Sequence, residues 1–187
     1  MTSKFLLSGS GGQGVITMAI LLAQAAALYE GRVALQSQSY GPEARGGATR
    51  SDVIISDEPI LYPKVHHANS FVALTQEASN KYLQYIRPNG LFLFDSDMVR
   101  PSRRMDARYV GLPMNRTVLE HFHKTQVLNI CVLGALLELT KAVSIDAIKE
   151  CLKNRFAKPF HAANEEALAL GVELARDFVA KSEEAFA

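Results

Sequence analysis

A glycine-rich turn near the amino terminus is the first feature of the sequence whose residues are suited to chemistry. Gly9, Gly11 and Gly14 follow the G-x-G-x-x-G spacing. Gly12 and Gln13 lie within the same turn. Glycine adopts positive φ without steric cost, and the missing Cβ exposes backbone N–H groups beside a helix N-terminus, where phosphates commonly bind. The turn therefore predicts an anion site, and the alternative is a structural turn that lets the next helix pack closely on its strand.

A long polar loop, residues 37–50, is the second candidate. Loops of this length inside compact domains tend to be functional or disordered. Because the loop follows the second expected strand, we expect it near the carboxyl ends of the strands, beside the glycine turn, where ligands bind in open α/β sheets. Gly46 and Gly47 offer backbone donors, and Arg45 or Arg50 could pair with a carboxylate or phosphate. The alternative is a solvated loop.

The surrounding sequence predicts an alternation of strands and helices. An apolar strand, Phe5–Leu7, precedes the glycine turn, and a helix that is apolar on nearly every face, Val15–Tyr29, follows it and ends at Gly31. A second helix begins at Thr75, whose hydroxyl is a typical N-cap. The remaining strands are expected at residues 33–35, 51–56, 71–74, 91–95 and 107–112.

The last third of the chain reads as helical. Residues 127–139 are apolar almost all round, with Asn129 as the one polar residue, which we expect to form a structural hydrogen bond. A helix starting at Ser144 ends before Pro159, and an amphipathic helix covers residues 162–181. The sequence predicts one domain, residues 1–187, with a three-layer α/β/α Rossmann-like sheet and a helical C-terminal third. The sheet would be mixed if residues 60–62 paired back on 51–56 as a hairpin.

A conventional NAD site requires an acidic residue at the end of the second strand, where it binds the ribose hydroxyls. This sequence has Gln36, Ser37 and Gln38 there instead. The pattern therefore argues against nicotinamide cofactors but leaves an anion site possible. Asp95 and Asp97, at the end of the fifth expected strand, are expected to cap a loop, and the alternative is that they bind a hydroxyl or a cation.

Composition excludes several classes of function. Twenty basic and nineteen acidic side chains give a formal net charge of +1, so nothing favours nucleic acid or a membrane surface as partner. No apolar run reaches transmembrane length, and the N-terminus lacks a signal-peptide pattern, so we expect a cytoplasmic protein. The two cysteines, Cys131 and Cys151, are too few for an iron–sulfur cluster, and the five histidines show no metal-ligand spacing.

Three segments, in order, resemble the gamma subunit of 2-oxoacid:ferredoxin oxidoreductases. They are residues 9–15 (Gly-Ser-Gly-Gly-Gln-Gly-Val), 39–47 (Ser-Tyr-Gly-Pro-Glu-Ala-Arg-Gly-Gly) and 51–54 (Ser-Asp-Val-Ile). The chain is most similar to the small gamma chain of the 2-oxoglutarate type, and the same unit occurs as an internal domain of single-chain pyruvate enzymes. The two C-terminal helices that cover residues 128–139 and 162–181 also fit, so the resemblance spans most of the chain.

The resemblance implies a complex that oxidatively decarboxylates a 2-oxoacid to an acyl-coenzyme A and passes two electrons singly to ferredoxin. In such enzymes thiamine diphosphate and its Mg²⁺ lie between the alpha and beta subunits. Iron–sulfur clusters lie on beta or on a ferredoxin-like delta chain. This chain would then bind none of these cofactors alone, and coenzyme A would be a substrate of the complex. Pyruvate, branched-chain and indolepyruvate enzymes have related gamma units, so they remain alternatives to 2-oxoglutarate.

The resemblance also places Tyr40, Glu43, Arg45, Gly46 and Gly47 at a subunit interface or at the entrance for coenzyme A. The glycine turn would either hold a phosphate of coenzyme A or anchor the adjoining subunit. Because the sequence contains no base–nucleophile pair, we expect no catalytic residue and no turnover from the isolated chain. The rival interpretations are a stand-alone nucleotide-binding oxidoreductase and a regulatory module that binds an anion.

Overall fold

The computed structural model describes residues 1–39 and 47–184 of the chain. The strands are β1 (Thr2–Gly9), β2 (Val33–Ser39), β3 (Thr49–Ser56), β4 (Ala68–Ala73), β5 (Ile86–Asp95) and β6 (Ala107–Leu112). The α-helices are α1 (Val15–Gln24), α2 (Gln76–Tyr82), α3 (Met114–Phe122), α4 (Leu128–Thr140), α5 (Ile145–Arg155) and α6 (His161–Glu184). Three short helical turns complete the elements: η1 (Ala25–Tyr29), η3 (Leu83–Tyr85) and η4 (Lys158–Phe160).

The strands form one mixed sheet in the order β2-β3-β1-β4-β5-β6. Strands β1, β4, β5 and β6 are parallel neighbours, whereas β3 runs antiparallel to both β1 and β2. The predicted mixed sheet is therefore confirmed, but the predicted hairpin is wrong. Residues 60–62 form no strand, and β3 pairs with β2 and β1 instead. Strand β2 is also longer than the predicted residues 33–35 and continues through Ser39. Its second half is polar, as an edge strand can be, so the sequence did not indicate it.

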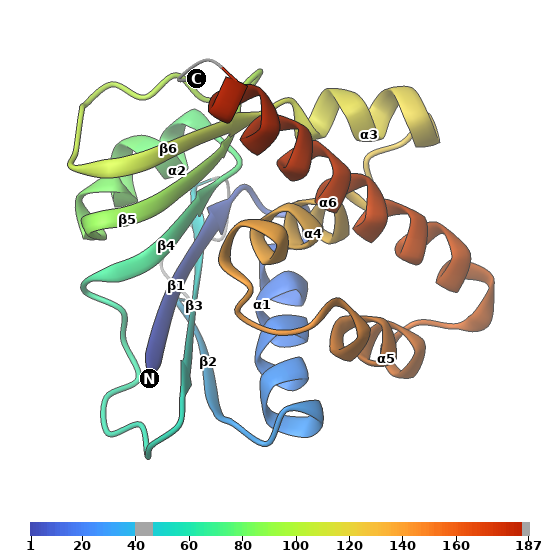
Figure 1. Ribbon diagram of the computed structural model, residues 1–187, viewed down its shortest axis with the longest axis horizontal. Helices are drawn as coiled ribbons and strands as arrows, with labels where there is room; N and C mark the ends of the chain where they lie inside the picture. Colours follow the sequence, from blue (N-terminus) through green and yellow to red (C-terminus); the bar gives the residue numbers. More distant parts are fainter. Residues whose placement is uncertain (40–46, 185–187) are drawn as a thin grey trace.

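The core lies on both faces of the sheet, and the two faces are covered unequally. Helices α1, α4, α5 and α6 lie on one face and α2 on the other (Figure 1). In β1, Phe5 and Leu7 belong to the cluster under the four helices, whereas Leu6 belongs to the cluster under α2. Burial on both faces explains why this strand reads as a continuous apolar run rather than as an alternation. The predicted α/β class and helical C-terminal third are confirmed.

Helix boundaries follow the expected local signals. Thr75 and Ser144 cap α2 and α5, because each hydroxyl accepts a hydrogen bond from a backbone N–H in the first turn. The first helix continues from α1 into the π-helical turn η1, and Gly31 follows with φ 63°. Across the two described ranges, no helix combines the length and the apolar character needed to cross a bilayer.

Helices α4 and α6 cross at unusually close range because both carry glycine at the crossing. A Cβ built on Gly134 would lie 2.2 Å from the carbonyl oxygen of Leu168. A Cβ built on Gly171 would lie 1.8 Å from the carbonyl oxygen of Cys131. The two backbones therefore touch where side chains would otherwise separate them, and this contact holds α4 directly against α6.

Candidate functional site

The glycine turn lies where β1 meets α1, at the carboxyl edge of the parallel strands. β1 ends at Gly9, and Gly14 is the N-cap of α1. Gly12 and Gly14 have φ values of 88° and 70°, a region that side chains rarely adopt. The turn therefore requires glycine at these two positions for its backbone path alone.

Gln13 closes the turn internally. Its Oε1 accepts a hydrogen bond from the backbone N–H of Ser10 at 2.7 Å, and its own N–H donates to the Ser10 carbonyl at 3.3 Å. A Cβ on Gly9 would lie 2.5 Å from the same Oε1, so glycine is needed there to admit this side chain. The Gln13 amide oxygen thus holds the shape of the turn, and it occupies one of the backbone donors that an anion would otherwise use.

Asn129, in the first turn of α4, ties that helix to the turn. Its Nδ2 donates to the carbonyl oxygen of Gly14 at 3.3 Å, and the residue is only 7% exposed. A Cβ on Gly14 would lie 2.6 Å from Nδ2. The expected structural hydrogen bond of Asn129 is confirmed, and its partner is the glycine turn itself.

Gly11 and Gly12 form the open part of the turn. Both are exposed, and a Cβ built on either one meets no atom within 4 Å. No side chain caps α1, and its first turn has no acidic residue. Backbone N–H groups at a helix N-terminus that lack a side-chain acceptor are suited to an anion or to a partner's carbonyl groups.

The candidate loop begins and ends beside this turn. Tyr40, Glu43, Arg45 and Gly46 lie outside the described residues, and Gly47 is half-buried at the end of the loop. The next strand is tied directly to the turn. The hydroxyl of Thr49 donates to the Gly9 carbonyl at 2.9 Å, and the hydroxyl of Ser8 donates to the Thr49 carbonyl at 2.6 Å. Neither hydroxyl was among the predicted site residues, although Thr49 lies only two residues after Gly47.

Arg50 is used within the fold, which corrects the expectation that it could meet a ligand. Its Nε and Nη2 donate to the two carboxylate oxygens of Asp52 at 2.8 and 2.9 Å. The guanidinium also lies 4.7 Å from the ring centroid of Tyr85 and donates to the carbonyl of Val65. A cation held by a bidentate pair and an aromatic face is not free for a bound anion.

The carboxylate of Asp95 caps the loop after β5, as expected from the sequence. It is 1% exposed and accepts hydrogen bonds from the N–H groups of Asp97, Met98 and Asn115 at 3.0, 3.2 and 2.6 Å. Burial raises its pKa above the ordinary range, although these backbone donors act in the opposite direction. Asp97 pairs with Arg116 at 3.4 Å. Both carboxylates therefore have structural partners.

The two thiols have the character of core residues. Cys131 and Cys151 are both buried, and burial raises the pKa of Cys131 to about 12. A thiol with such a pKa is neither a nucleophile nor a ready metal ligand. Within residues 1–39 and 47–184, no group of three or more histidine, cysteine, aspartate or glutamate side chains is placed to hold a metal ion.

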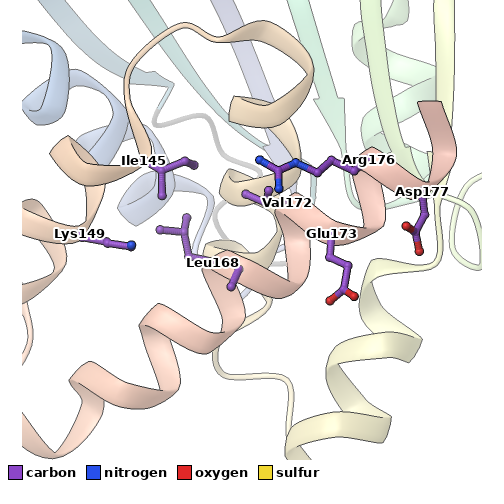
Figure 2. A pocket seen from close by; sticks show the side chains of 8 residues that line it. Ile145, Lys149, Leu168, Val172, Glu173, Arg176 and Asp177 are labelled. Atoms are coloured by element: carbon purple, nitrogen blue, oxygen red, sulfur yellow. The ribbon is translucent and has the colours of Figure 1, made fainter. Parts of the chain in front are cut away.

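A groove of about 530 Å³ lies between α5 and α6 (Figure 2). Ile145, Leu168 and Val172 form its apolar part, with Lys149 and Arg176 on either side (Figure 2). Arg176 is paired with Glu138 at 3.2 Å and Lys149 with Asp146 at 3.7 Å. Both cations thus already have carboxylate partners, and the groove shows no constellation for catalysis.

Known proteins that are similar to this chain in sequence and fold are subunits of oxoacid oxidoreductases. The KorC subunit of 2-oxoglutarate synthase from Methanocaldococcus jannaschii is 40% identical over 179 residues, which cover 95% of this chain and 96% of the relative. The keto/oxoacid ferredoxin oxidoreductase gamma subunit from Geobacter sulfurreducens superposes with a TM-score of 0.85 at 37% identity, covering 94% of this chain and 99% of that one. The 2-oxoglutarate:ferredoxin oxidoreductase from Magnetococcus marinus also superposes with a TM-score of 0.85, at 25% identity. In that case, 94% of this chain matches 31% of a longer chain.

The fold and the glycine turn define an α/β domain of the kind that forms gamma subunits of oxoacid:ferredoxin oxidoreductases. Residues 4–174 match the pyruvate ferredoxin/flavodoxin oxidoreductase family. The chain belongs to this family, as its resemblance to gamma subunits predicted.

Proposed function

We propose that this chain is the gamma subunit of a 2-oxoglutarate:ferredoxin oxidoreductase. The complex would convert 2-oxoglutarate and coenzyme A to succinyl-coenzyme A and carbon dioxide, and pass two electrons singly to ferredoxin. The observation that carries the proposal is end-to-end similarity to 2-oxoglutarate synthase subunits, which reaches 40% identity over 96% of a relative's length. Pyruvate synthase subunit PorC of Methanothermobacter marburgensis matches at 26% identity over 93% of its length, which favours 2-oxoglutarate over pyruvate.

The partners follow from the same assignment. The chain assembles with alpha and beta subunits, and with a delta chain where the complex has one, and it contacts ferredoxin only through the complex. Thiamine diphosphate, Mg²⁺ and the iron–sulfur clusters belong to those partners. The buried, protonated thiols and the structurally paired carboxylates of this chain support the assignment of these cofactors to the partner subunits.

Within the complex, we place the contact to coenzyme A or to an adjoining subunit at the glycine turn and the loop beside it. Three observations support this position: the exposed Gly11 and Gly12, the uncapped N-terminus of α1, and the hydrogen bonds that hold Thr49 to the turn. Gly9, Gln13 and Gly14 shape the backbone that would make the contact. The loop residues of this proposed contact are Tyr40, Glu43, Arg45, Gly46 and Gly47.

The test is capture of the tagged chain from its native cells, followed by an assay of the captured material. We expect co-purifying subunits and viologen reduction that requires both coenzyme A and a 2-oxoacid, fastest with 2-oxoglutarate. Pyruvate, 2-oxoisovalerate and indolepyruvate serve as competing substrates. A preference for one of these would reassign the enzyme, and a chain captured alone without activity would refute the subunit assignment.

The loop contact is tested separately in the captured complex with Arg45→Ala. We expect weaker assembly or a higher KM for coenzyme A. Arg87→Ala is the matched control, because Arg87 is an exposed arginine at the opposite edge of the sheet. If Arg45→Ala behaves like the control in both measurements, Arg45 does not make the contact.

A further inference from the structure

Another, smaller pocket is formed by three segments of the chain. The segment before α4, the end of α5 and the start of α6 enclose about 230 Å³ there. Its apolar walls come from Val127, Phe156, Phe160 and Ala163. Phe160 is 57% exposed, although phenylalanine is usually among the more buried residue types.

Asn164 is the buried polar residue of this pocket, and Gln126 and Lys124 also line it. It is only 4% exposed and lines the cavity, yet its carboxamide forms no hydrogen bond with any residue that the structure describes. Asn129 is buried to a similar extent and has its partner in the Gly14 carbonyl. The Asn164 amide atoms are not among the buried side-chain atoms without a partner, so they stay accessible, and a peptide group that enters the pocket can pair with them.

The volume limits what can enter. Sites for complete cofactors or drug-sized ligands usually measure about 300–1,000 Å³, and this pocket is smaller. It suits a single large apolar side chain, whose neighbouring peptide group could pair with the carboxamide of Asn164. Pockets that receive one anchoring side chain are typical centres of protein–protein interfaces.

The rim of the pocket is basic. Lys124 lines the pocket, Arg155 directly precedes the lining residue Phe156, and Lys158 lies two residues before Phe160. All three cations are exposed, and none of them forms an ion pair with a residue in the described ranges. Lys153, in the same helix, differs because Glu150 pairs with it at 2.7 Å. The free positive charge favours an acidic partner segment.

We propose that this pocket docks a partner subunit of the oxidoreductase through one large apolar side chain on an acidic segment. A peptide group of that segment pairs with Asn164, and its carboxylates lie near Lys124, Arg155 and Lys158. The inference rests on the proposed function, because it requires the partner subunits of that complex.

The test is competitive incorporation in cells that produce the partner subunits. Wild-type chain with one tag and variant chain with another are expressed together, and complexes are isolated through a partner subunit. Ala163→Trp fills the pocket and Asn164→Leu removes the amide at similar size. We expect each variant to be incorporated about tenfold less than wild type, since central interface contacts contribute at least that factor. Lys124→Glu should reduce incorporation about threefold.

Two measurements separate docking from a folding defect. Asn164→Leu should leave the thermal stability of the free chain close to that of wild type, because the amide it removes forms no hydrogen bond with the described residues and leucine has a similar size. Phe160→Ala alters only a largely exposed ring and should still reduce incorporation. Ala169→Trp is the matched control, an exposed alanine of α6 that lies in the other groove, and should be incorporated like wild type.

The outcomes distinguish this proposal from the proposed function. If wild-type chain is absent from the isolated partner complex, the subunit assignment itself fails. If wild type is present and all pocket variants are incorporated equally, only the docking proposal is overturned, and the pocket holds water. If the variants are incorporated equally but change self-association of the free chain, the occupant is a second copy, which also overturns the proposal.

Discussion

At the scale of single residues, the glycines of the turn have different reasons to be glycine. Gly9 admits the Gln13 side chain, and Gly14 combines positive φ with contact to Asn129. Gly11 has neither constraint, because its φ is not positive and no atom lies within 4 Å of a built Cβ. The fold therefore explains Gly9, Gly12 and Gly14, whereas the proposed contact with a ligand or partner would account for Gly11.

Gly14→Ala should destabilise the free chain. The left-handed backbone alone costs roughly 1–2 kcal/mol for a residue with a Cβ. The added methyl group would also lie 2.6 Å from Nδ2 of Asn129, so displacement of that side chain adds to this loss. Urea unfolding of the single variants and of Gly14→Ala/Asn129→Ala measures the two parts, because Asn129→Ala removes the two closest atoms, Nδ2 and Cγ, but leaves the backbone strain at position 14. Fully additive losses would show that Asn129 does not oppose a side chain at position 14.

Gly11→Ala should behave in the opposite way. Stability of the free chain should stay within about 0.5 kcal/mol of wild type or rise slightly, since alanine reduces the entropy of the unfolded chain. In the assembled complex, the same methyl group should raise the KM for coenzyme A or weaken assembly. Gly12→Ala is the comparison, because its φ of 88° predicts lost stability as well. Unchanged KM and assembly in Gly11→Ala would remove the open part of the turn from the functional contact.

At the scale of elements, local sequence signals were sufficient to predict strands and helix ends, but not to predict which strands pair. The apolar runs of β1 and β5, the caps Thr75 and Ser144, and the helix-ending Gly31 all act through neighbours in sequence, so they could be predicted. The antiparallel partner of β3 could not be predicted. Choosing between β1, forty residues upstream of β3, and the adjacent residues 60–62 depends on long-range packing that periodicity does not encode.

The candidate site likewise has features that the sequence predicted and features that it did not. Glycine spacing predicted the position of the turn, and the order of elements predicted that the loop would begin and end beside it. The pair of Arg50 with Asp52 is local, because residues two apart on β3 share a face, whereas its contacts with Tyr85 and Val65 depend on long-range packing that the sequence pattern did not predict. The pocket at Asn164 was equally hidden, since its walls come from three separate segments.

The α4–α6 crossing gives the prediction that belongs to this scale. Gly134→Ala and Gly171→Ala would each place a methyl group within 2.2 Å of a backbone carbonyl oxygen of the facing helix. Because backbone cannot yield as a side chain can, we expect each variant to lose about 2–3 kcal/mol of unfolding free energy or more. Ala169→Ser, on the exposed side of α6, should stay within about 0.5 kcal/mol. Wild-type stability in both glycine variants would mean that the helices separate without loss.

At the scale of the whole molecule, charge is balanced, and individual carboxyl groups determine how stability responds to acid. Glu138 joins α4 to α6, because it pairs with Lys141 at 2.7 Å and with Arg176 at 3.2 Å. The hydrogen bond from Lys141, followed by that from Arg176, holds the pKa of Glu138 below its ordinary value of about 4.5. The pKa of the buried Asp95 shifts in the opposite direction, since burial raises it.

Glu138→Gln should therefore remove part of the acid sensitivity of the protein. A carboxyl group with a lowered folded-state pKa contributes stability above its unfolded value, and this contribution is lost as pH falls through the folded value. The wild-type advantage over Glu138→Gln should be present at pH 7, amount to less than about 1 kcal/mol, and decline below pH 4.5, the ordinary value of this group. Asp95 opposes this trend, because its contribution is lost as pH rises through its raised pKa.

Urea unfolding of wild type and Glu138→Gln at pH 7 and at about pH 3 measures this difference in stability, with Glu173→Gln on the exposed surface of α6 as control. A gap between wild type and Glu138→Gln that stays constant with pH would show that the amide replaces the carboxylate in holding α4 to α6.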